Sequence, residues 1–286
     1  MPPDGSHHEV NGVRLFYEER GEGVPLVLLH SGFADRRMWD REMETLSRGY
    51  RVVRYDRRGF GRSDPFPGPY SDAQDLDALL TDLGISAAVL VASSKGATAA
   101  LDLSLAHPEK VAALILAGPV VEGCGVQGDP QEQRLTQLLE LREMEIARAV
   151  QLEGVERATD LLLDLWGSRL SAPERARIRE LVLENAPMAL AGVSLTLPPD
   201  PPTFQRLERV RCPTELLVGE ADDPLILHWA RAMAPRLPQG WATVIPDADH
   251  FVNLSQPAAF QERILSCLRR LRGALACGTG SPGAVG

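Results

Sequence analysis

The chain has 286 residues, 44% of them apolar and 24% charged, which are ordinary proportions for a globular protein with a buried core. Its formal net charge of -9 disfavours a nucleic-acid partner, because the phosphate backbone binds basic surfaces. The apolar runs are far shorter than the roughly 18 residues of a membrane helix, and the polar start is unlike a signal peptide. We therefore expect a cytoplasmic protein with no membrane partner.

Short apolar runs predict the strands of a sheet. An Asn11-Gly12 turn, flanked by Val10 and residues 15–17, is typical of a tight hairpin. Continuous apolar runs are typical of strands covered on both faces, as in a parallel sheet. Such runs occupy residues 25–30, 51–55, 88–92, 111–117, 214–218 and 242–245.

Helical patterns lie between these runs. Residues 72–83 place four leucines on one stripe before Gly84, residues 95–106 are rich in alanine and leucine, and residues 257–271 form an amphipathic segment. Strands that alternate with helices predict an α/β fold with a mostly parallel, doubly wound sheet.

One long segment interrupts this alternation. Residues 122–202 contain no strand pattern and several helical ones, at 131–151, 155–165, 172–184 and 186–193, and they end in a proline cluster. We interpret residues 122–202 as a helical cap inserted into a core formed by residues 1–121 and 203–275. The glycine-rich residues 276–286 are expected to be a disordered tail.

The clearest chemical motif surrounds Ser94. A strand ends there, a tight turn follows, and a helix begins at once, so the serine is pushed out over the sheet edge. Such a turn needs small residues two positions before and after the nucleophile, and Ala92 and Gly96 meet this need, whereas the neighbours of Ser93 do not. The Lys95 backbone N–H, at the start of the helix, would be one donor of an oxyanion hole.

With this motif the chain resembles the α/β-hydrolase superfamily over residues 8–272. The residues His30-Ser31-Gly32-Phe33 resemble the loop that supplies the second oxyanion donor in that family. The resemblance implies the Gly32 N–H as this donor, with the Phe33 N–H as the alternative, and it implies that His30 braces the loop. Residues 56–64 (DRRGFGRSD) resemble another loop of the family, which is structural rather than catalytic.

The resemblance also implies the acid and the base of a catalytic triad. The family's acid stands three residues after a glycine at a strand end, which selects Asp222 after Gly219. Asp223 is the first alternative and Glu122 the second. Residues 247–251 (DADHF) resemble the loop that carries the base, which selects His250 and gives the chain order Ser, Asp, His. We expect His228 to lie on the outside of its helix.

Residues 34–40 (ADRRMWD) and the helical insertion resemble carboxylesterases and enol-lactone hydrolases. The resemblance implies a serine hydrolase that cleaves an ester or lactone of a small organic substrate through an acyl-enzyme, with no cofactor and no metal. The cap is expected to form the substrate pocket. The candidate lining residues are Phe33, Leu138, Leu141, Met144, Leu162 and Trp166.

Alternatives remain on the same fold. A cofactor-free haloperoxidase or perhydrolase and a carbon–carbon bond hydrolase use the same triad, and a ligand-binding homologue without activity keeps the fold. The Lys95 side chain also has two interpretations: it meets an anionic substrate or the oxyanion, or it turns to solvent or a nearby acid. The sequence carries no pattern that specifies an oligomeric state.

Overall fold

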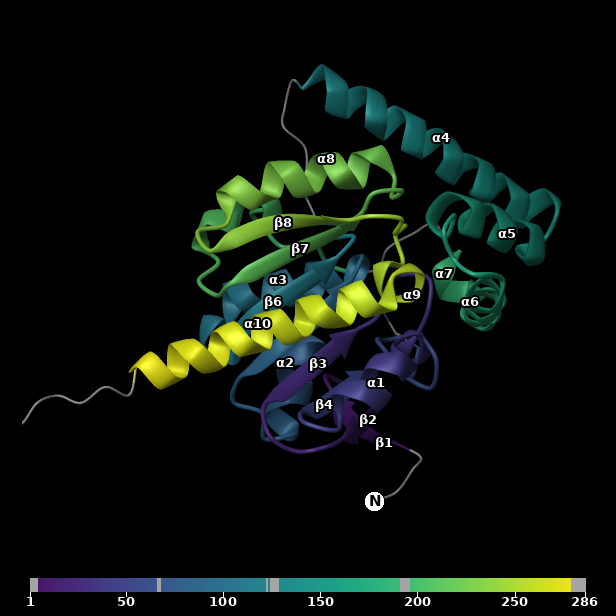
Figure 1. Cartoon of the computed structure of the whole chain (residues 1–286). Helices are drawn as coiled ribbons and strands as arrows, with labels where there is room; N and C mark the ends of the chain where they lie inside the picture. Colours follow the sequence, from purple (N-terminus) through teal and green to yellow (C-terminus); the bar gives the residue numbers. More distant parts are fainter. Residues whose placement is uncertain (1–4, 66–67, 122, 124–128, 191–195, 279–286) are drawn as a thin grey trace, which may run out of the picture.

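The computed structural model describes residues 5–65, 68–121, 123, 129–190 and 196–278, with residues 272–278 described by their backbone alone. Its centre is one eight-stranded sheet in the order β1-β2-β4-β3-β5-β6-β7-β8 (Figure 1). Strands β3 to β8 run parallel to one another, and β1 and β2 pair antiparallel at one edge. The strands are β1 Ser6–Val10, β2 Val13–Arg20, β3 Pro25–Leu29, β4 Arg51–Tyr55, β5 Ala88–Ser93, β6 Val111–Ala117, β7 Thr214–Gly219 and β8 Gly240–Ile245.

Helices cover both faces of this sheet. Figure 1 shows α1 and α10 on one face and α2 and α3 on the other, which confirms the predicted doubly wound α/β architecture. Strands β3 and β5 contribute almost wholly buried side chains, as the continuous apolar runs predicted. The core helices are α1 Asp40–Leu46, α2 Asp72–Asp82, α3 Lys95–Ala106, α8 Pro224–Met233, α9 Val252–Ser255 and α10 Pro257–Gly278, and 3-10 turns cover Arg36–Trp39, Pro108–Lys110, Thr203–Arg209 and Ala234–Arg236.

In the described part of the segment expected to be a cap, four α-helices lie between β6 and β7 in the chain, and the name cap refers to these helices from here on. They are α4 Pro130–Leu152, α5 Val155–Trp166, α6 Ala172–Glu184 and α7 Ala186–Ala189, and they gather beyond one end of the sheet (Figure 1). Helix α7 ends at Ala189, earlier than expected, and residues 191–195 lie outside the described part of the chain. Helix α10 continues to Gly278, into the segment expected to be a tail, of which residues 279–286 are not described.

Polar contacts join this helical cap to the core. The buried Asn185 side chain donates to Asp35 Oδ2 (2.9 Å) and accepts from the Gly61 backbone N–H (2.8 Å). On α8, Trp229 Nε1 donates to Glu132 Oε1 of α4 (2.8 Å). The cap is therefore held on the core from two sides of the sheet end.

His228 is not on the outside of its helix, contrary to the expectation. Its side chain is only 18% exposed, and its Nε2 lies 3.2 Å from Asp129 Oδ2, at the start of α4. The reason is that α4 packs along α8 and covers the face of α8 that carries this histidine.

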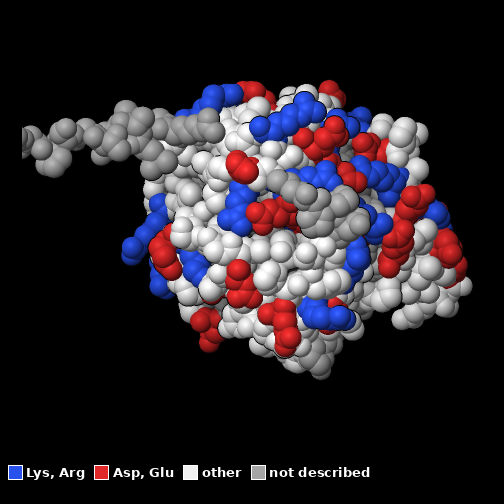
Figure 2. Space-filling model, turned by 90° about the horizontal axis from the view of Figure 1, so that it is seen from below, with Lys and Arg blue, Asp and Glu red and all other residues white. Residues whose placement is uncertain are grey.

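The charged surface and the lengths of the helices are the features that bear on partners. Basic and acidic side chains of the described residues are interleaved over the face of the molecule drawn in Figure 2, rather than separated into broad areas of one sign. Among the described helices, none combines the length and the apolar composition that a membrane crossing requires.

Helix α1 carries a buried carboxyl group, Glu42, which is 2% exposed. Burial raises the pKa of Glu42 to about 7, and the hydrogen bond from Asn253 opposes the shift only in part. Asn253 lies on α9, the short helix that follows His250 in the chain, so this hydrogen bond joins α1 to α9.

We expect the Glu42→Gln variant to lose a pH dependence of stability that the wild type has. A raised pKa means that the folded protein holds a proton which the unfolded chain releases near pH 4.5, so wild-type stability falls as pH rises from 4.5 to about 7. The difference in free energy of unfolding between wild type and variant should change by up to about 1.4 kcal/mol per pH unit. Urea unfolding at several pH values measures it, and parallel curves would refute the raised pKa.

Candidate active site

The turn at Ser94 has the strained geometry of a nucleophile elbow. Strand β5 is buried along its whole length, and Ser94 follows it with φ 51° and ψ -118° before α3 begins. A positive φ is unfavourable for a residue with a Cβ, so neighbouring bonds must hold it. The Ser94 N–H donates to the Ala117 carbonyl (2.8 Å), and its own carbonyl accepts from Ala97 (2.9 Å). The serine is 2% exposed and lines a cavity.

The elbow brings α3 against β3, which explains the small residue at position 96. A Cβ added to Gly96 would lie 2.7 Å from the Leu29 carbonyl oxygen and 2.8 Å from that of His30. Both atoms belong to the backbone and cannot turn away. Gly96 therefore permits the close approach that places Ser94 above the sheet edge.

Replacing Gly96 by alanine is expected to destabilise the fold by about 1–3 kcal/mol, because the new methyl group overpacks the backbone of β3. Gly49→Ala is the matched control, since a Cβ there meets nothing within 4 Å, and its effect should stay within about 0.5 kcal/mol. Urea unfolding of the two variants measures both. Equal stabilities would contradict the close approach.

His250 and Asp222 form a buried pair beside this turn. His250 Nδ1 lies 3.0 Å from Asp222 Oδ1 and 3.1 Å from Oδ2, and the two side chains are 1% and 0% exposed. The Gly118 loop packs closely here, since a Cβ at Gly118 would lie 2.8 Å from Nδ1. A carboxylate at Nδ1 places the ring proton on that nitrogen, so Nε2 keeps its lone pair.

The other face of the imidazole touches the cap. The Trp166 ring of α5 packs on the His250 ring, with centroids 4.5 Å apart, and its carbonyl accepts from the His250 N–H (3.2 Å). The Phe33 ring in turn stacks on the Trp166 ring, with the two centroids 5.9 Å apart. His250 Nε2 is buried and has no hydrogen-bond partner in the described part of the chain, Ser94 included. The nitrogen with the lone pair is thus left for a reacting group.

The other acids near Asp222 and His250 in the chain do not contact the His250 ring as Asp222 does. Asp223 accepts from the Leu225 N–H (2.9 Å) and caps the start of α8, and burial raises its pKa. Asp249 accepts from the Arg169 N–H of the cap (2.7 Å). Glu122, the second alternative for the acid, lies outside the described residues. Among the described acids, Asp222 is the one that hydrogen-bonds to the His250 ring.

The loop after β3 lies next to the elbow and is braced by His30. This ring is fully buried; its Nε2 accepts from the Arg57 N–H (2.9 Å) and its Nδ1 donates to the Ser31 carbonyl (2.7 Å). Burial, aided by the Arg57 charge, lowers the pKa of His30 to about 3, so the ring is neutral. The Phe33 N–H donates to Ser31 Oγ (3.3 Å), which favours Gly32 over Phe33 as a donor toward the cavity.

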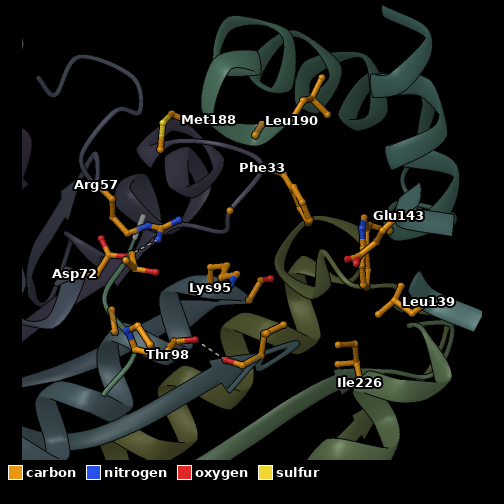
Figure 3. Close-up of a pocket in the computed structure, with 18 of the residues that line it drawn as sticks. Phe33, Arg57, Asp72, Lys95, Thr98, Leu139, Glu143, Met188, Leu190 and Ile226 are labelled. Carbon is orange, nitrogen blue, oxygen red and sulfur yellow. Dashed lines mark hydrogen bonds and ion pairs between the residues drawn. The ribbon is translucent and has the colours of Figure 1, made fainter. Parts of the chain in front are cut away.

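A cavity of about 840 Å³ lies between the core and the cap, and Gly32, Ser94 and Lys95 line its floor. Figure 3 shows Arg57, Asp72 and Met188 on one side of Lys95, and Leu139, Glu143 and Ile226 on the other. The first side is polar, with an ion pair between Arg57 Nη1 and Asp72 Oδ2 (2.9 Å). The second side is mostly apolar where α4 faces α8. The cavity can therefore hold a small molecule that has a polar end and an apolar end.

The structure corrects two of the expected lining residues. Phe33, Met144, Leu162 and Trp166 line the cavity, but Leu138 and Leu141 do not and are 59% and 63% exposed. Helix α4 turns another face to the cavity, and a shift of one residue rotates a side chain by about 100°. That face carries Thr136, Leu139, Glu140, Glu143, Ile146 and Ala147.

Several lining residues had no signal in the sequence. Arg57 belongs to a loop that the sequence predicts to be structural, and Asp72 to the start of a predicted helix. Ile226 and Trp229 belong to a helix for which the sequence indicates no function. The apolar stripe of α8 indicates one face packed on the core, and it gives no sign of the second partner, α4.

Comparisons with known proteins agree with this fold. A family model described as the alpha/beta hydrolase family matches residues 26–263. RutD, a candidate carbamate hydrolase from Caulobacter sp. (strain K31), is 30% identical over 273 residues, which cover 93% of this chain and 96% of the relative. Among solved structures, a thermophilic esterase from Thermogutta terrifontis is 29% identical, with a TM-score of 0.75. The match covers 93% of this chain and 97% of the esterase chain. Est816, an N-acyl homoserine lactone degrading enzyme, is 25% identical with a TM-score of 0.67, covering 91% and 99%.

Proposed function

Because the chain belongs to the α/β-hydrolase family, we propose that it is a serine hydrolase that cleaves a carboxylic ester or lactone of a small organic substrate. The observation that carries the proposal is the buried His250–Asp222 pair, with Nδ1 and Oδ1 3.0 Å apart. The pair packs against Gly118, directly after the residue whose carbonyl accepts from the N–H of the strained Ser94, and Ser94 lines the cavity. A nucleophile, a base and an orienting acid are the three parts that acyl transfer requires.

In the proposed first step, Ser94 Oγ attacks the acyl carbonyl while His250 Nε2 accepts its proton. Asp222 holds the imidazole in the tautomer that leaves Nε2 unprotonated, and it stabilises the imidazolium that forms. The unused hydrogen-bonding capacity of the buried Nε2 supports this role. The bond between nucleophile and base is often long before substrate binds and shortens in the complex.

Two backbone N–H groups are proposed to stabilise the tetrahedral oxyanion. The Lys95 N–H lies at the first position of α3, where helix N–H groups point out of the helix, and the Gly32 N–H lies on the adjacent loop. Each such donor is typically worth about 10²–10³ in rate. His30 is a positioning residue, since it holds this loop through Ser31 and the Arg57 backbone.

The imidazolium then gives its proton to the leaving oxygen, and water attacks the acyl-enzyme with His250 again as base. None of these steps requires a metal or an organic cofactor. The names of the relatives support the choice of bond, because esters, lactones and carbamates all carry a carbonyl bonded to a heteroatom that leaves.

A substrate panel tests the proposal. Purified protein is assayed with nitrophenyl esters of increasing acyl length, with γ- and δ-lactones, with thioesters, and with acetate, peroxide and halide together. We expect saturable hydrolysis of esters or lactones. Perhydrolysis without ester hydrolysis, or no turnover of any member by folded protein, would contradict the proposal.

A further inference from the structure

The Lys95 side chain lies within the candidate pocket. A Cβ added to Gly32 would lie 3.1 Å from Lys95 Cγ, so the stem of the lysine crosses the oxyanion loop at close range. The residue is half-buried and lines the cavity together with Ser94 (Figure 3). The stem of the lysine therefore lies at the cavity, between the oxyanion loop and the candidate nucleophile's helix.

Glu143 of α4 lines the same cavity and interacts electrostatically with Lys95. Burial raises the pKa of the Glu143 carboxyl, the Lys95 charge opposes this shift, and the acids Glu140 and Asp223 add to it. The carboxyl group is partly enclosed at the cavity, while the residue as a whole keeps exposed surface, so water still reaches the Glu143 side chain.

The second cation of the cavity is bound differently. Arg57 and Asp72 lie 2.9 Å apart with side chains 4% and 11% exposed, and Arg57 Nη2 also donates to the Ser31 carbonyl (3.0 Å). Separating this pair would leave a buried charge without a partner, which is strongly unfavourable. An incoming anion therefore displaces Asp72 from Arg57 only at a high cost.

We infer that Lys95 and Glu143 set the charge preference of the pocket, and that the preferred substrate is an ester or lactone that carries a carboxylate. On binding, this carboxylate interacts with the Lys95 ammonium beside Ser94, against the repulsion of the Glu143 carboxylate on the same cavity. The inference rests on the proposed function, because it names the substrate class of the same site.

Substrates of matched shape that differ in charge test the inference. One pair places the charge in the acyl part: 4-nitrophenyl hydrogen adipate and its uncharged counterpart, 4-nitrophenyl 6-methylheptanoate. The other places it in the alcohol part: 4-(hexanoyloxy)benzoate and the uncharged 4-(hexanoyloxy)benzamide. The measured quantity is the ratio of kcat/KM for the charged to the uncharged substrate, which cancels effects of a variant on catalysis in general.

For at least one pair, Lys95→Met should lower this ratio about tenfold, because an attractive charge is lost in a partly desolvated site. Glu143→Gln should raise the same ratio several-fold, because the competing carboxylate is gone. Glu145→Gln is the control: it removes the same charge from α4 at a residue that is exposed and does not line the cavity, so the ratio should stay unchanged.

The outcomes separate the two proposals. Ratios that stay at the wild-type value in both Lys95→Met and Glu143→Gln overturn the charge preference, while hydrolysis by the wild type leaves the proposed function intact. If Lys95→Met fails to fold, the rise expected for Glu143→Gln decides alone. A wild type that hydrolyses none of the four substrates, and whose Ser94 is not labelled by a small fluorophosphonate, overturns both proposals.

Discussion

Replacing Ser94 by alanine is expected to lower kcat for ester or lactone hydrolysis by about 10⁴-fold or more, because the nucleophile that forms the acyl-enzyme is lost. Residual activity should come only from the oxyanion donors and substrate binding. The measurement is steady-state kinetics on the best substrate of the panel, with circular dichroism to show that the variant folds.

Ser93→Ala is the matched control for Ser94→Ala. Ser93 is the preceding residue, is 0% exposed, and its Oγ has no hydrogen-bond partner among the described residues. Removing an unsatisfied buried hydroxyl is neutral or stabilising, so activity should stay within a few-fold of the wild type. If the two variants lose activity equally, or Ser93→Ala loses more, the assignment of the nucleophile is wrong.

Replacing Asp222 by asparagine is expected to lower kcat by about 10⁴-fold with little change in KM. The amide keeps the shape of the side chain but donates a hydrogen to His250 Nδ1, which puts the ring proton on Nε2 and removes the base. The measurement is kcat and KM on the same substrate, and the loss should appear almost entirely in kcat.

Asp223→Asn separates the two adjacent acids. Asp223 caps α8 through the Leu225 N–H, and asparagine is an equally good cap, so both stability and activity should change little. A loss in Asp223→Asn as large as that in Asp222→Asn would contradict the choice of the acid. A loss confined to Asp223→Asn would reverse it.

The parts of the fold predicted best were those set by local patterns. Each of the parallel strands β3 to β8 lies within two residues of its predicted run, because a buried parallel strand needs an apolar side chain at nearly every position. At the hairpin, Asn11 and Gly12 both have positive φ, as an Asn-Gly turn requires. The Ser94 elbow was likewise visible, because strand, turn and helix meet within a few residues.

What the sequence could not supply depends on packing between distant segments. Leu138 and Leu141 were assigned to the pocket as apolar cap residues, but the packing of α4 on α8, marked by the bond from Trp229 to Glu132, decides which face of α4 meets the cavity. Arg57 lies in a loop whose path is set by His30 and Asp72, both distant in the chain. Neither of these contacts between distant segments leaves a local pattern in the sequence.

Intact-mass analysis after treatment with a small fluorophosphonate tests most directly whether Ser94 is activated. We predict one covalent adduct on the wild type, no adduct on Ser94→Ala, and slow labelling of His250→Ala, because the probe reacts rapidly only with a serine whose proton is removed by a base. An adduct that persists in Ser94→Ala, or a folded wild type that gains no mass, would contradict it.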